Sequence, residues 1–533
     1  MKQIIVGGYY DLLNVATTEY AAFSGSYSWN GSISAALQMV STPGTIRNLR
    51  VELDDVPGTG TYTFTLYRGV GVGAPAATTL TCTVAADGTT ASDTAHDVTV
   101  AAGDVIVLEC NPDSPDNARY ARWTIEFEGD NANESLILAH SYSSKTATVY
   151  AALGCYSVLN NENDTRRVCP TAGKIKNLFI QLNLDPGTAP DAYKATLRIA
   201  NAGNGYVLTD TALTCTITAD DKTGNNVADE ITVVAGDILN IKIDPLETPS
   251  SAPFLYIGMT FEADIDGESI LWGGSSNNLS NADTEYNSLA AYLGLAWTAT
   301  EAQMYQLSQE CTFKKLYMLL SAAPGAGNSY TFTVRNEGAS TGLTVAISGT
   351  DTTGNDVAHT ASIADGDSVD LMVVPDSTPT VANAYWGLVC YATGVTAYER
   401  SLSTSIGLSS SLQRSVVNNR YLTTSIGVTP ALERVKGVVR SLSTSIGLSP
   451  ALLRLSTKSR SLSTSIGLSP SLTKSYGTVR SLTTSIGLIA RKLSWRGKQH
   501  RRHSSGSTNR TIEQSGTNRT IKEVGDNRDN EYW

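Results

Sequence analysis

Three similar segments, spaced about 130 residues apart, constrain the fold of this 533-residue chain more than any other feature. Each copy contains a Gly-Asp pair between two short apolar runs, at Gly103-Asp104, Gly236-Asp237 and Gly366-Asp367. The turn glycines lie 133 and 130 residues apart. Apolar and polar residues alternate before each pair, as in residues 62–66 and 330–334, and this period of two marks half-buried strands. The chain therefore repeats one β-rich unit three times.

Each copy holds several short strands separated by turn signals, with no helical period. This spacing is typical of a two-sheet antiparallel β-sandwich. We therefore predict an all-β chain with three tandem antiparallel β-sandwich domains, jelly-roll-like in topology, at residues 1–130, 131–264 and 265–396. A lead-in segment before each copy, such as residues 287–294, is either an extra edge strand or a short helix.

Residues 397–490 follow a strict period of 20, and the unit that begins at Arg400 recurs from Arg420, Arg440, Arg460 and Arg480. Leu and Ile occupy even positions, and because 20 is even this parity persists through every repeat. Gly and Pro within the unit oppose a helix. We predict five β-repeats that stack or wind with other chains through an apolar stripe made of Leu402, Ile406, Leu408, Leu442, Ile446, Leu448, Leu462, Ile466 and Leu468. A solvated low-complexity linker is the alternative.

Charge divides the chain into two parts. Residues 400–510 carry 18 Lys and Arg against one acid, Glu433, a formal charge of +17, whereas residues 1–399 carry 18 basic and 44 acidic residues, a formal charge of −26. Such opposed blocks indicate different surroundings for the two parts or head-to-tail attraction between copies. In the basic then mixed-charge tail at 491–533, Trp495 could stack on a base, but solvated charge is the more common role, so nucleic acid is not a favoured partner.

Cysteine usage and hydropathy place few constraints on chemistry. The seven cysteines have no metal-like spacing, and their odd number favours buried thiols, although Cys155 and Cys169 could bridge a loop. No apolar run approaches the roughly 20 residues of a membrane-spanning helix. The first residues do not form a secretory signal, so we expect neither a membrane span nor a cleaved leader.

The sequence contains few candidate catalytic residues. Of five histidines, His96 and His359 fall at equivalent places in copies one and three, where copy two has Asp229, which suggests a shared structural position. Motifs for nucleotide binding, hydrolysis and zinc chemistry are missing. The acidic turns at 220–226 and 351–356 could supply calcium ligands, but turn formation explains them more simply. We therefore predict a protein that is not an enzyme, with no catalytic residue, no cofactor and no metal site.

The segment from Tyr330 to Trp386 resembles tandem β-sandwich modules of tailed-phage virion proteins, on its start at 330–338, its turn at 349–356 and its hairpin at 364–367. The Ser-Leu-Ser-Thr-Ser-Ile-Gly-Leu repeats resemble stretches of phage-like surface proteins. The resemblance covers about residues 40–490 and implies a structural or attachment role in a virion, as a fibre, spike or capsid-decorating protein. It also implies a homo-oligomer, with a trimer favoured, and contacts with other virion proteins.

Two further expectations accompany this interpretation. Four aromatic residues, if exposed, are candidates for contact with host-surface glycans, and core packing is their alternative role: Tyr292, Trp297, Tyr385 and Trp386. We expect the protein in the virion after synthesis in the host cytoplasm. The alternative function is a cell-surface adhesin or extracellular filament subunit at the extracellular surface.

Overall fold

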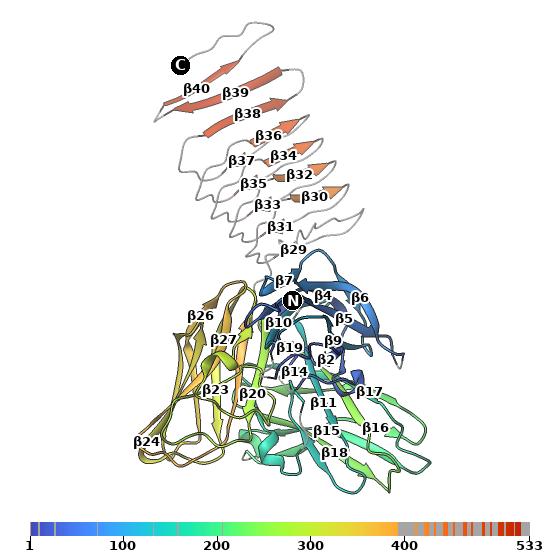
Figure 1. The fold of residues 1–533 in the computed structure, drawn as a ribbon. Coiled ribbons are helices and arrows are strands. Elements are labelled where there is room, and N and C mark those ends of the chain that lie inside the picture. The colour runs from blue at the N-terminus through green and yellow to red at the C-terminus, as the bar shows by residue number, and fades with distance from the viewer. Residues whose placement is uncertain are drawn as a thin grey trace. The chain divides into compact units, whose positions relative to one another are not determined.

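The computed structural model describes residues 2–392, apart from 9–10, 26–27, 72, 132, 157–158 and 205, and beyond them the backbone of strands between residues 411 and 523. The chain divides into two compact units, residues 1–394 and 395–533 (Figure 1). The described elements are β-strands and short 3-10 helices, so the predicted all-β class is confirmed. The 3-10 helices are η1 (Ile33–Ala35), η2 (Glu162–Thr165), η3 (Ala202–Asn204) and η4 (Glu301–Gln303).

The first unit contains three sandwiches in chain order. The first comprises β1 (Lys2–Gly8), β2 (Glu19–Ala21), β3 (Gln38–Met39), β4 (Gly44–Leu53), β5 (Thr61–Gly69), β6 (Ala76–Val84), β7 (Thr90–Asp93), β8 (Val98–Val100), β9 (Val105–Asp113) and β10 (Ala121–Gly129). The second comprises β11 (Glu134–Tyr142), β12 (Val149–Ala151), β13 (Arg167–Val168), β14 (Gly173–Leu182), β15 (Ala192–Ala200), β16 (Thr209–Thr218), β17 (Thr223–Val233), β18 (Ile238–Leu246) and β19 (Phe254–Ala263). The third comprises β20 (Glu268–Ser275), β21 (Glu285–Asn287), β22 (Gln306–Leu307), β23 (Cys311–Leu320), β24 (Gly325–Asn336), β25 (Ala339–Gly349), β26 (Thr353–Ile363), β27 (Ser368–Asp376) and β28 (Ala384–Tyr391).

Strand order identifies each sandwich as a jelly roll. One sheet places the first strand beside the last, in the orders β1-β10-β4-β7, β11-β19-β14-β17 and β20-β28-β23-β26. The facing sheet has the orders β2-β9-β5-β6, β12-β18-β15-β16 and β21-β27-β24-β25, with β3, β13 and β22 added beside β9, β18 and β27. Neighbouring strands pair antiparallel throughout these sheets, and the alternation of the chain between two sheets is the jelly-roll arrangement. Each lead-in contains an edge strand (β2, β12, β21) and a 3-10 helix (η1, η2, η4), but of the predicted residues 287–294 only Asn287 belongs to one of these elements.

The Gly-Asp turns join β8 to β9, β17 to β18 and β26 to β27. The strands of each pair lie in facing sheets and do not pair with each other, so the predicted hairpin at 364–367 is wrong: β26 pairs with β23, and β27 pairs with β24. Gly103, Gly236 and Gly366 have φ angles of 92°, 94° and 92°, a conformation that residues with a side chain rarely adopt. The following aspartate closes each turn, since its carboxylate accepts a hydrogen bond from the backbone N–H three residues earlier. The same glycine and aspartate therefore form the turn between the two sheets in all three copies.

A second repeated device explains the equivalent histidines. The Asp93 carboxylate accepts from the N–H groups of Ala95 and His96, and Asp356 does the same for His359. Both imidazoles also contact their aspartate through Nδ1, at 2.9 and 3.0 Å from the nearer oxygen. In the second copy an asparagine at residue 226 caps the N–H of Asp229 in the same way. The predicted shared structural position is confirmed.

Each sandwich begins with a strand that is buried on both faces. Even residues of β1, Ile4 and Val6, pack in the core of the third sandwich, whereas Ile5 packs in the core of the first. In β11, Leu136 and Leu138 join the first core, and Ile137 and Ala139 join the second. In β20, Ile270 and Trp272 join the second core, and Leu271 joins the third.

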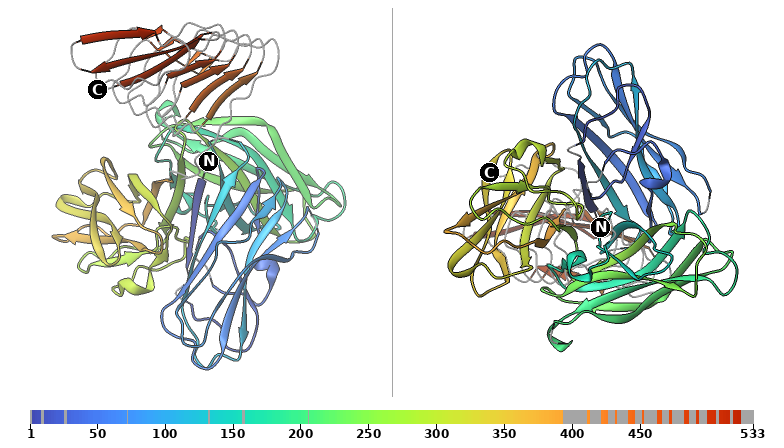
Figure 2. Two further views of the ribbon diagram at one scale, coloured as in Figure 1. Left: turned by 90° about the horizontal axis from the view of Figure 1, so that it is seen from above. Right: turned by 60° about the horizontal axis from the view of Figure 1, so that its bottom comes forward.

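This sharing is cyclic. Because β11 links sandwich two to one, β20 links three to two and β1 links one to three, the sandwiches close into a ring around their first strands. Figure 2 shows the three sandwiches as blue, green and yellow lobes around the N-terminal strand. The expected tandem arrangement is thus a closed body whose three cores depend on one another.

The second unit consists of parallel strands followed by an antiparallel sheet. Strands one period apart pair in register, so that Leu422 lies beside Leu442, and Leu442 beside Leu462. One sheet contains β29 (Ser411–Leu412), β31 (Ala431–Leu432), β33 (Ala451–Leu452), β35 (Ser471–Leu472) and β37 (Arg491–Lys492). The other contains β30 (Tyr421–Ser425), β32 (Ser441–Ser445), β34 (Leu462–Ser465) and β36 (Leu482–Ser485), and a third contains β38 (Gln499–Ser505), β39 (Thr508–Ser515) and β40 (Asn518–Glu523). These backbone pairs join repeats of one chain.

The shared strand β1 makes a position-specific prediction. Replacing Ile4 with Ala opens a cavity in the core of the third sandwich, more than 260 residues away in sequence, whereas Ile5→Ala opens one in the first. We expect each to lower the free energy of unfolding by about 2–5 kcal/mol. Hydrogen exchange should rise selectively in β23 and β27 for Ile4→Ala and in β5 and β9 for Ile5→Ala. Identical exchange patterns for the two variants would contradict the sharing of β1 between two cores.

Candidate functional site: the junction of the three sandwiches

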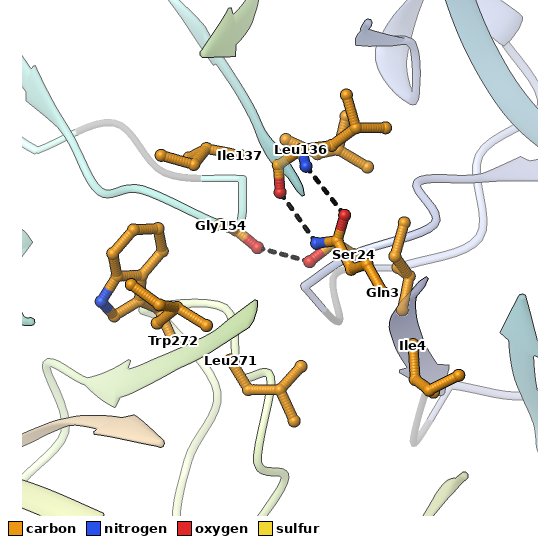
Figure 3. A pocket seen from close by; sticks show the side chains of 11 residues that line it. Gln3, Ile4, Ser24, Leu136, Ile137, Gly154, Leu271 and Trp272 are labelled. Carbon is orange, nitrogen blue, oxygen red and sulfur yellow. Dashed lines mark hydrogen bonds between the residues drawn. The ribbon is translucent and has the colours of Figure 1, made fainter. Parts of the chain in front are cut away.

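The first strands meet at the centre of the ring, beside a small cavity. A space of about 20 Å³ is lined by three consecutive residues from each of β1, β11 and β20, together with Ser24 and Gly154. The carboxamide of Gln3 bridges two strand edges, since its Nε2 donates to the Leu136 carbonyl at 2.9 Å and its Oε1 accepts from the Leu136 N–H at 2.8 Å (Figure 3). Ser24 Oγ donates to the Gly154 carbonyl at 2.8 Å. The centre is thus an interface closed by hydrogen bonds, and its volume suits one water molecule.

A buried glutamate begins the first strand of the second and third sandwiches. Glu134 accepts hydrogen bonds from Thr42 of the first sandwich and pairs with Lys176 at 2.9 Å. Glu268 accepts from Thr171 of the second sandwich and pairs with Lys315 at 2.8 Å, while Lys314 lies at 2.9 Å. Each glutamate therefore joins its own sandwich to the lead-in of the preceding one.

The third junction uses the opposite charge at the same position. The residue of β1 that corresponds in register to Glu134 and Glu268 is Lys2, because Lys2 faces Glu128 as Glu134 faces Glu262. The compensating carboxylate is Glu126 on the neighbouring strand β10, which pairs with Lys2 at 2.9 Å and with Arg47 at 2.8 Å. All three junctions therefore bury a paired charge, but one has its sign reversed.

The electrostatics of these carboxylates follow from their partners. Burial alone would raise the pKa of Glu268, but hydrogen bonds from Lys315, Thr171 and Lys314 outweigh it and lower the pKa below its ordinary value. The pKa of Glu134 is lowered in the same way, where burial is opposed by Thr42 and Lys176. Burial is likewise outweighed at Glu126, chiefly by Lys2, and its pKa is lowered too. All three are ionised at neutral pH.

A β-bulge in the central strand aims one side chain at each junction. Asn48, Asn177 and Lys315 occupy equivalent places and have φ angles of 55°, 54° and 55°. Asparagine tolerates this left-handed conformation well, whereas lysine does so at a cost. In the third sandwich that cost accompanies the contact of Lys315 with Glu268. The bulge thus redirects a side chain from the strand to the interface.

The short strands β3, β13 and β22 each pack against the following sandwich. Two of these contacts require glycine. A Cβ at Gly258 would lie 2.3 Å from the Met39 carbonyl oxygen, and a Cβ at Gly387 would lie 2.0 Å from that of Val168. The third contact closes the ring through Arg122, whose Nη2 donates to the Ala302 carbonyl at 2.9 Å.

Buried polar side chains on the same short strands hold the lead-in loops. Gln38 makes two hydrogen bonds with the backbone of Ser24, and Gln306 makes two with the backbone of Ala290. The second copy has Arg167 at this position, fully buried, and its guanidinium donates instead to the Ala291 carbonyl of the third sandwich at 3.3 Å. This arginine is thus a further link between the second and third sandwiches.

His140 is buried between the first two sandwiches. Its ring lies 4.7 Å from that of Tyr156 and faces the backbone of Ala35. Burial lowers the pKa of His140 to about 4, against a smaller opposing effect of the Ala35 backbone. The imidazole is therefore neutral at physiological pH.

The glycan-contact prediction is contradicted by burial. Tyr385 and Trp386 have no exposed surface and Trp297 is 8% exposed, because strand pairing turns them into the core and the junction. The Trp386 indole donates to the Leu289 carbonyl at 2.8 Å, and its ring lies 5.8 Å from that of Trp297. Tyr292 is half-buried against the same core. Trp297, Tyr385 and Trp386 therefore offer no free face for stacking on a sugar, and their role is core packing.

All seven cysteines are buried and outside any disulfide, so Cys155 and Cys169 do not bridge the loop. In the apolar stripe, Leu442 and Leu462 lie in β32 and β34, and the other members lie outside the described residues: Leu402, Ile406, Leu408, Ile446, Leu448, Ile466 and Leu468. Within the described part of the chain, no three His, Cys, Asp or Glu side chains are grouped to hold a metal ion. No helix among those residues has the length and hydropathy to cross a membrane.

Sequence reasoning missed the junction, although a signal for it exists. The three first strands carry uninterrupted apolar runs at equivalent places, residues 4–6, 136–138 and 270–272. A strand buried on both faces has such a run in place of alternation. Comparison with known proteins adds no identification, since no family model and no curated protein matches the chain.

Removing the carboxylate of Glu268 should expose the cost of a buried unpaired charge. We expect Glu268→Ala to lower the free energy of unfolding by about 3–5 kcal/mol, because Lys314 and Lys315 lose their partner. The matched control is Glu230→Ala, whose exposed pair with Lys174 should contribute nothing measurable. The lowered pKa of Glu268 means that its contribution is present above pH 4.5 and is lost as the pH falls below it. Denaturant unfolding at pH 7 and pH 3.5 checks both statements, and equal losses in the two variants would refute the buried role.

His140 should limit stability in acid. Because its pKa is lowered from 6.5 to about 4 in the folded chain, the unfolded state binds a proton first, and stability falls as the pH drops from 6.5 to 4. The total loss corresponds to about 3 kcal/mol. His140→Phe, which retains a ring beside Tyr156, should flatten this part of the profile of unfolding free energy against pH. A full acid slope in His140→Phe would assign the effect to other groups.

Proposed function

We propose that the protein is a non-enzymatic structural component of a virion, of the fibre, spike or capsid-decorating kind, made in the host cytoplasm. The observation that carries the proposal is the closed ring of three jelly rolls that share their first strands. Jelly rolls build the shells of many viral capsids. A body with three similar lobes presents three similar outer surfaces, which suits a position among symmetric neighbours in a protein shell.

The polar chemistry of the ring supports an assembly role over a reaction. The buried charges at the junctions, those of Glu134, Glu268 and Glu126, are each paired with a lysine or arginine of the chain and point into interfaces. Their lowered pKa values keep them ionised at neutral pH, whereas a general acid would need a raised pKa. Glu134 and Glu268 also accept a hydrogen bond from the preceding sandwich, and Glu126 holds β1 to β10 and β4 within the first.

The second unit is proposed to carry self-association and contacts with other virion proteins. Residues 400–510 have a formal charge of +17 and residues 1–399 one of −26, so opposite charges of two copies attract. The backbone of the repeats pairs within one chain, which leaves the partner contacts to the side chains and the sheet edges. A trimer is the favoured oligomer.

Location tests the function directly. Antibodies raised against residues 2–392 should label particles released from cells that make the protein, at regular positions on a shell or tail seen by immunogold electron microscopy. Particles lacking the gene should lose the label. Labelling confined to cell envelopes would support the adhesin alternative and contradict the virion role.

Self-association through the second unit should appear in the solution mass. We expect the full chain to form a trimer or larger assembly by light scattering, and a chain that ends at Gly394 to be a folded monomer. Association driven by charge weakens as salt is raised from 50 to 500 mM, because the Debye length falls from about 14 to about 4 Å. Circular dichroism of the shorter chain controls for folding. A monomeric full chain at both salt concentrations would contradict the proposed role of residues 395–533.

A further inference from the structure

Asp370 is a fully buried carboxyl group in β27 of the third sandwich. Neither of its carboxylate oxygens has a hydrogen-bond partner among the described residues. The charged and titratable groups around it come from every element packed against this part of β27: Glu301 of η4, Arg335 of β24, Tyr286 of β21 and Tyr305 before β22. Two carboxyl groups thus share a single arginine.

The arginine is already committed to Glu301. Arg335 Nε lies 2.8 Å from Glu301 Oε1, and Arg335 Nη2 lies 3.3 Å from Oε2, a two-point contact that uses both carboxylate oxygens. Asp370 faces Arg335 across the strand pair without a hydrogen bond to it. An ionised Asp370 would therefore add an uncompensated negative charge in a buried place.

The other two sandwiches show what this position tolerates. Asn240 occupies the equivalent place in β18, since it faces Arg198 as Asp370 faces Arg335. Its amide donates to Thr165 Oγ1 at 3.0 Å and lies 3.4 Å from Glu162, the glutamate of η2 that pairs with Arg198.

In the first sandwich the same pair is Val107 and Tyr67, and neither side chain is charged at neutral pH. Two copies thus place a neutral side chain here, and only the third places a group that can lose a proton.

The chemistry of Asp370 follows from its surroundings. Burial and the nearby Glu301 raise the pKa of Asp370 to about 8, against the smaller opposing effect of Arg335. Below this pKa the group is a neutral acid, comparable with Asn240. After loss of the proton, Asp370 repels Glu301 and competes for Arg335.

Glu301 belongs to η4, and η4 is also the element of the third sandwich that Arg122 of the first sandwich contacts. Arg122 of β10 donates to the carbonyl of Ala302 in η4, and its guanidinium lies 5.1 Å from the centre of the Tyr305 ring. Because η4 stands between Asp370 and Arg122, a change at Glu301 is transmitted to the contact that closes the ring.

We propose that Asp370, Glu301 and Arg335 form a proton-controlled latch on η4, which loosens the contact between the third and first sandwiches when Asp370 loses its proton. The latch is distinct from the assembly role, because it acts inside one chain. Its direction is fixed by linkage: a group with a raised pKa stabilises the closed form at low pH and loses that contribution as the pH rises toward the folded-state pKa.

Hydrogen exchange of the full chain tests the latch, measured from pH 5 to pH 9 and corrected for the intrinsic exchange rate. We expect the opening equilibrium of residues 298–307 and 119–125 to grow about tenfold per pH unit up to about pH 8 and to level off above it. Residues 192–200 of the second sandwich serve as the internal reference. Asp370→Asn should abolish the pH dependence and raise the unfolding temperature at pH 7 to 9.

The matched variant is Asn240→Asp, which should introduce the same pH dependence at residues 159–168 in the second sandwich. It tests the position independently of how Asp370→Asn folds. A pH dependence unchanged by Asp370→Asn, or one that appears equally in the reference residues, would overturn the latch.

Discussion

The sharing of each first strand between two cores is the constraint on which the rest of the first unit depends. A jelly roll normally leaves its first strand at a sheet edge, where one face and a row of backbone groups meet solvent. Here β1, β11 and β20 direct one face into their own sandwich and the other into its neighbour. Burying three such strands together removes the exposed edges and makes each core incomplete without the adjacent sandwich.

The polar groups at the junctions follow from this arrangement. Strand ends that meet in a buried centre bring backbone and charged groups out of water, and each must find a partner. Gln3 pairs with the edge of β11, the glutamates at 134 and 268 pair with lysines, and Glu126 pairs with Lys2 and Arg47. Charged side chains are tolerated in the centre because no member of these pairs is left alone. Their specific geometry also excludes a shifted register of the three strands.

The repeat, the turns and the sandwiches could be predicted from the sequence, because they depend on local patterns. Gly366-Asp367 forms the same turn as its two equivalents, since positive φ and the aspartate cap are properties of a few adjacent residues. The ring could not be predicted from alternation, because a run such as residues 4–6 does not say which face meets which core. The aromatic pair at Tyr385 and Trp386 was misassigned for a related reason: both faces of β28 are covered, so adjacent residues are buried together.

A ring formed by one chain can have different residues at its three junctions, which a ring of identical chains cannot. Three identical subunits place the same residue at every junction, whereas this chain has glutamate at two equivalent positions and Lys2 at the third. The junctions also differ in whether a loop of the chain joins the two sandwiches. Short loops at residues 130–133 and 264–267 join the sandwiches at two junctions, but residues 2 and 391 at the third are not consecutive. That junction alone can open without stretching a connecting loop, and it is the one closed by Arg122 on η4 and bordered by the unpaired Asp370. The junction with Lys2 in place of glutamate is therefore also the junction without a connecting loop. In a nearly threefold body, this is the one junction that can open.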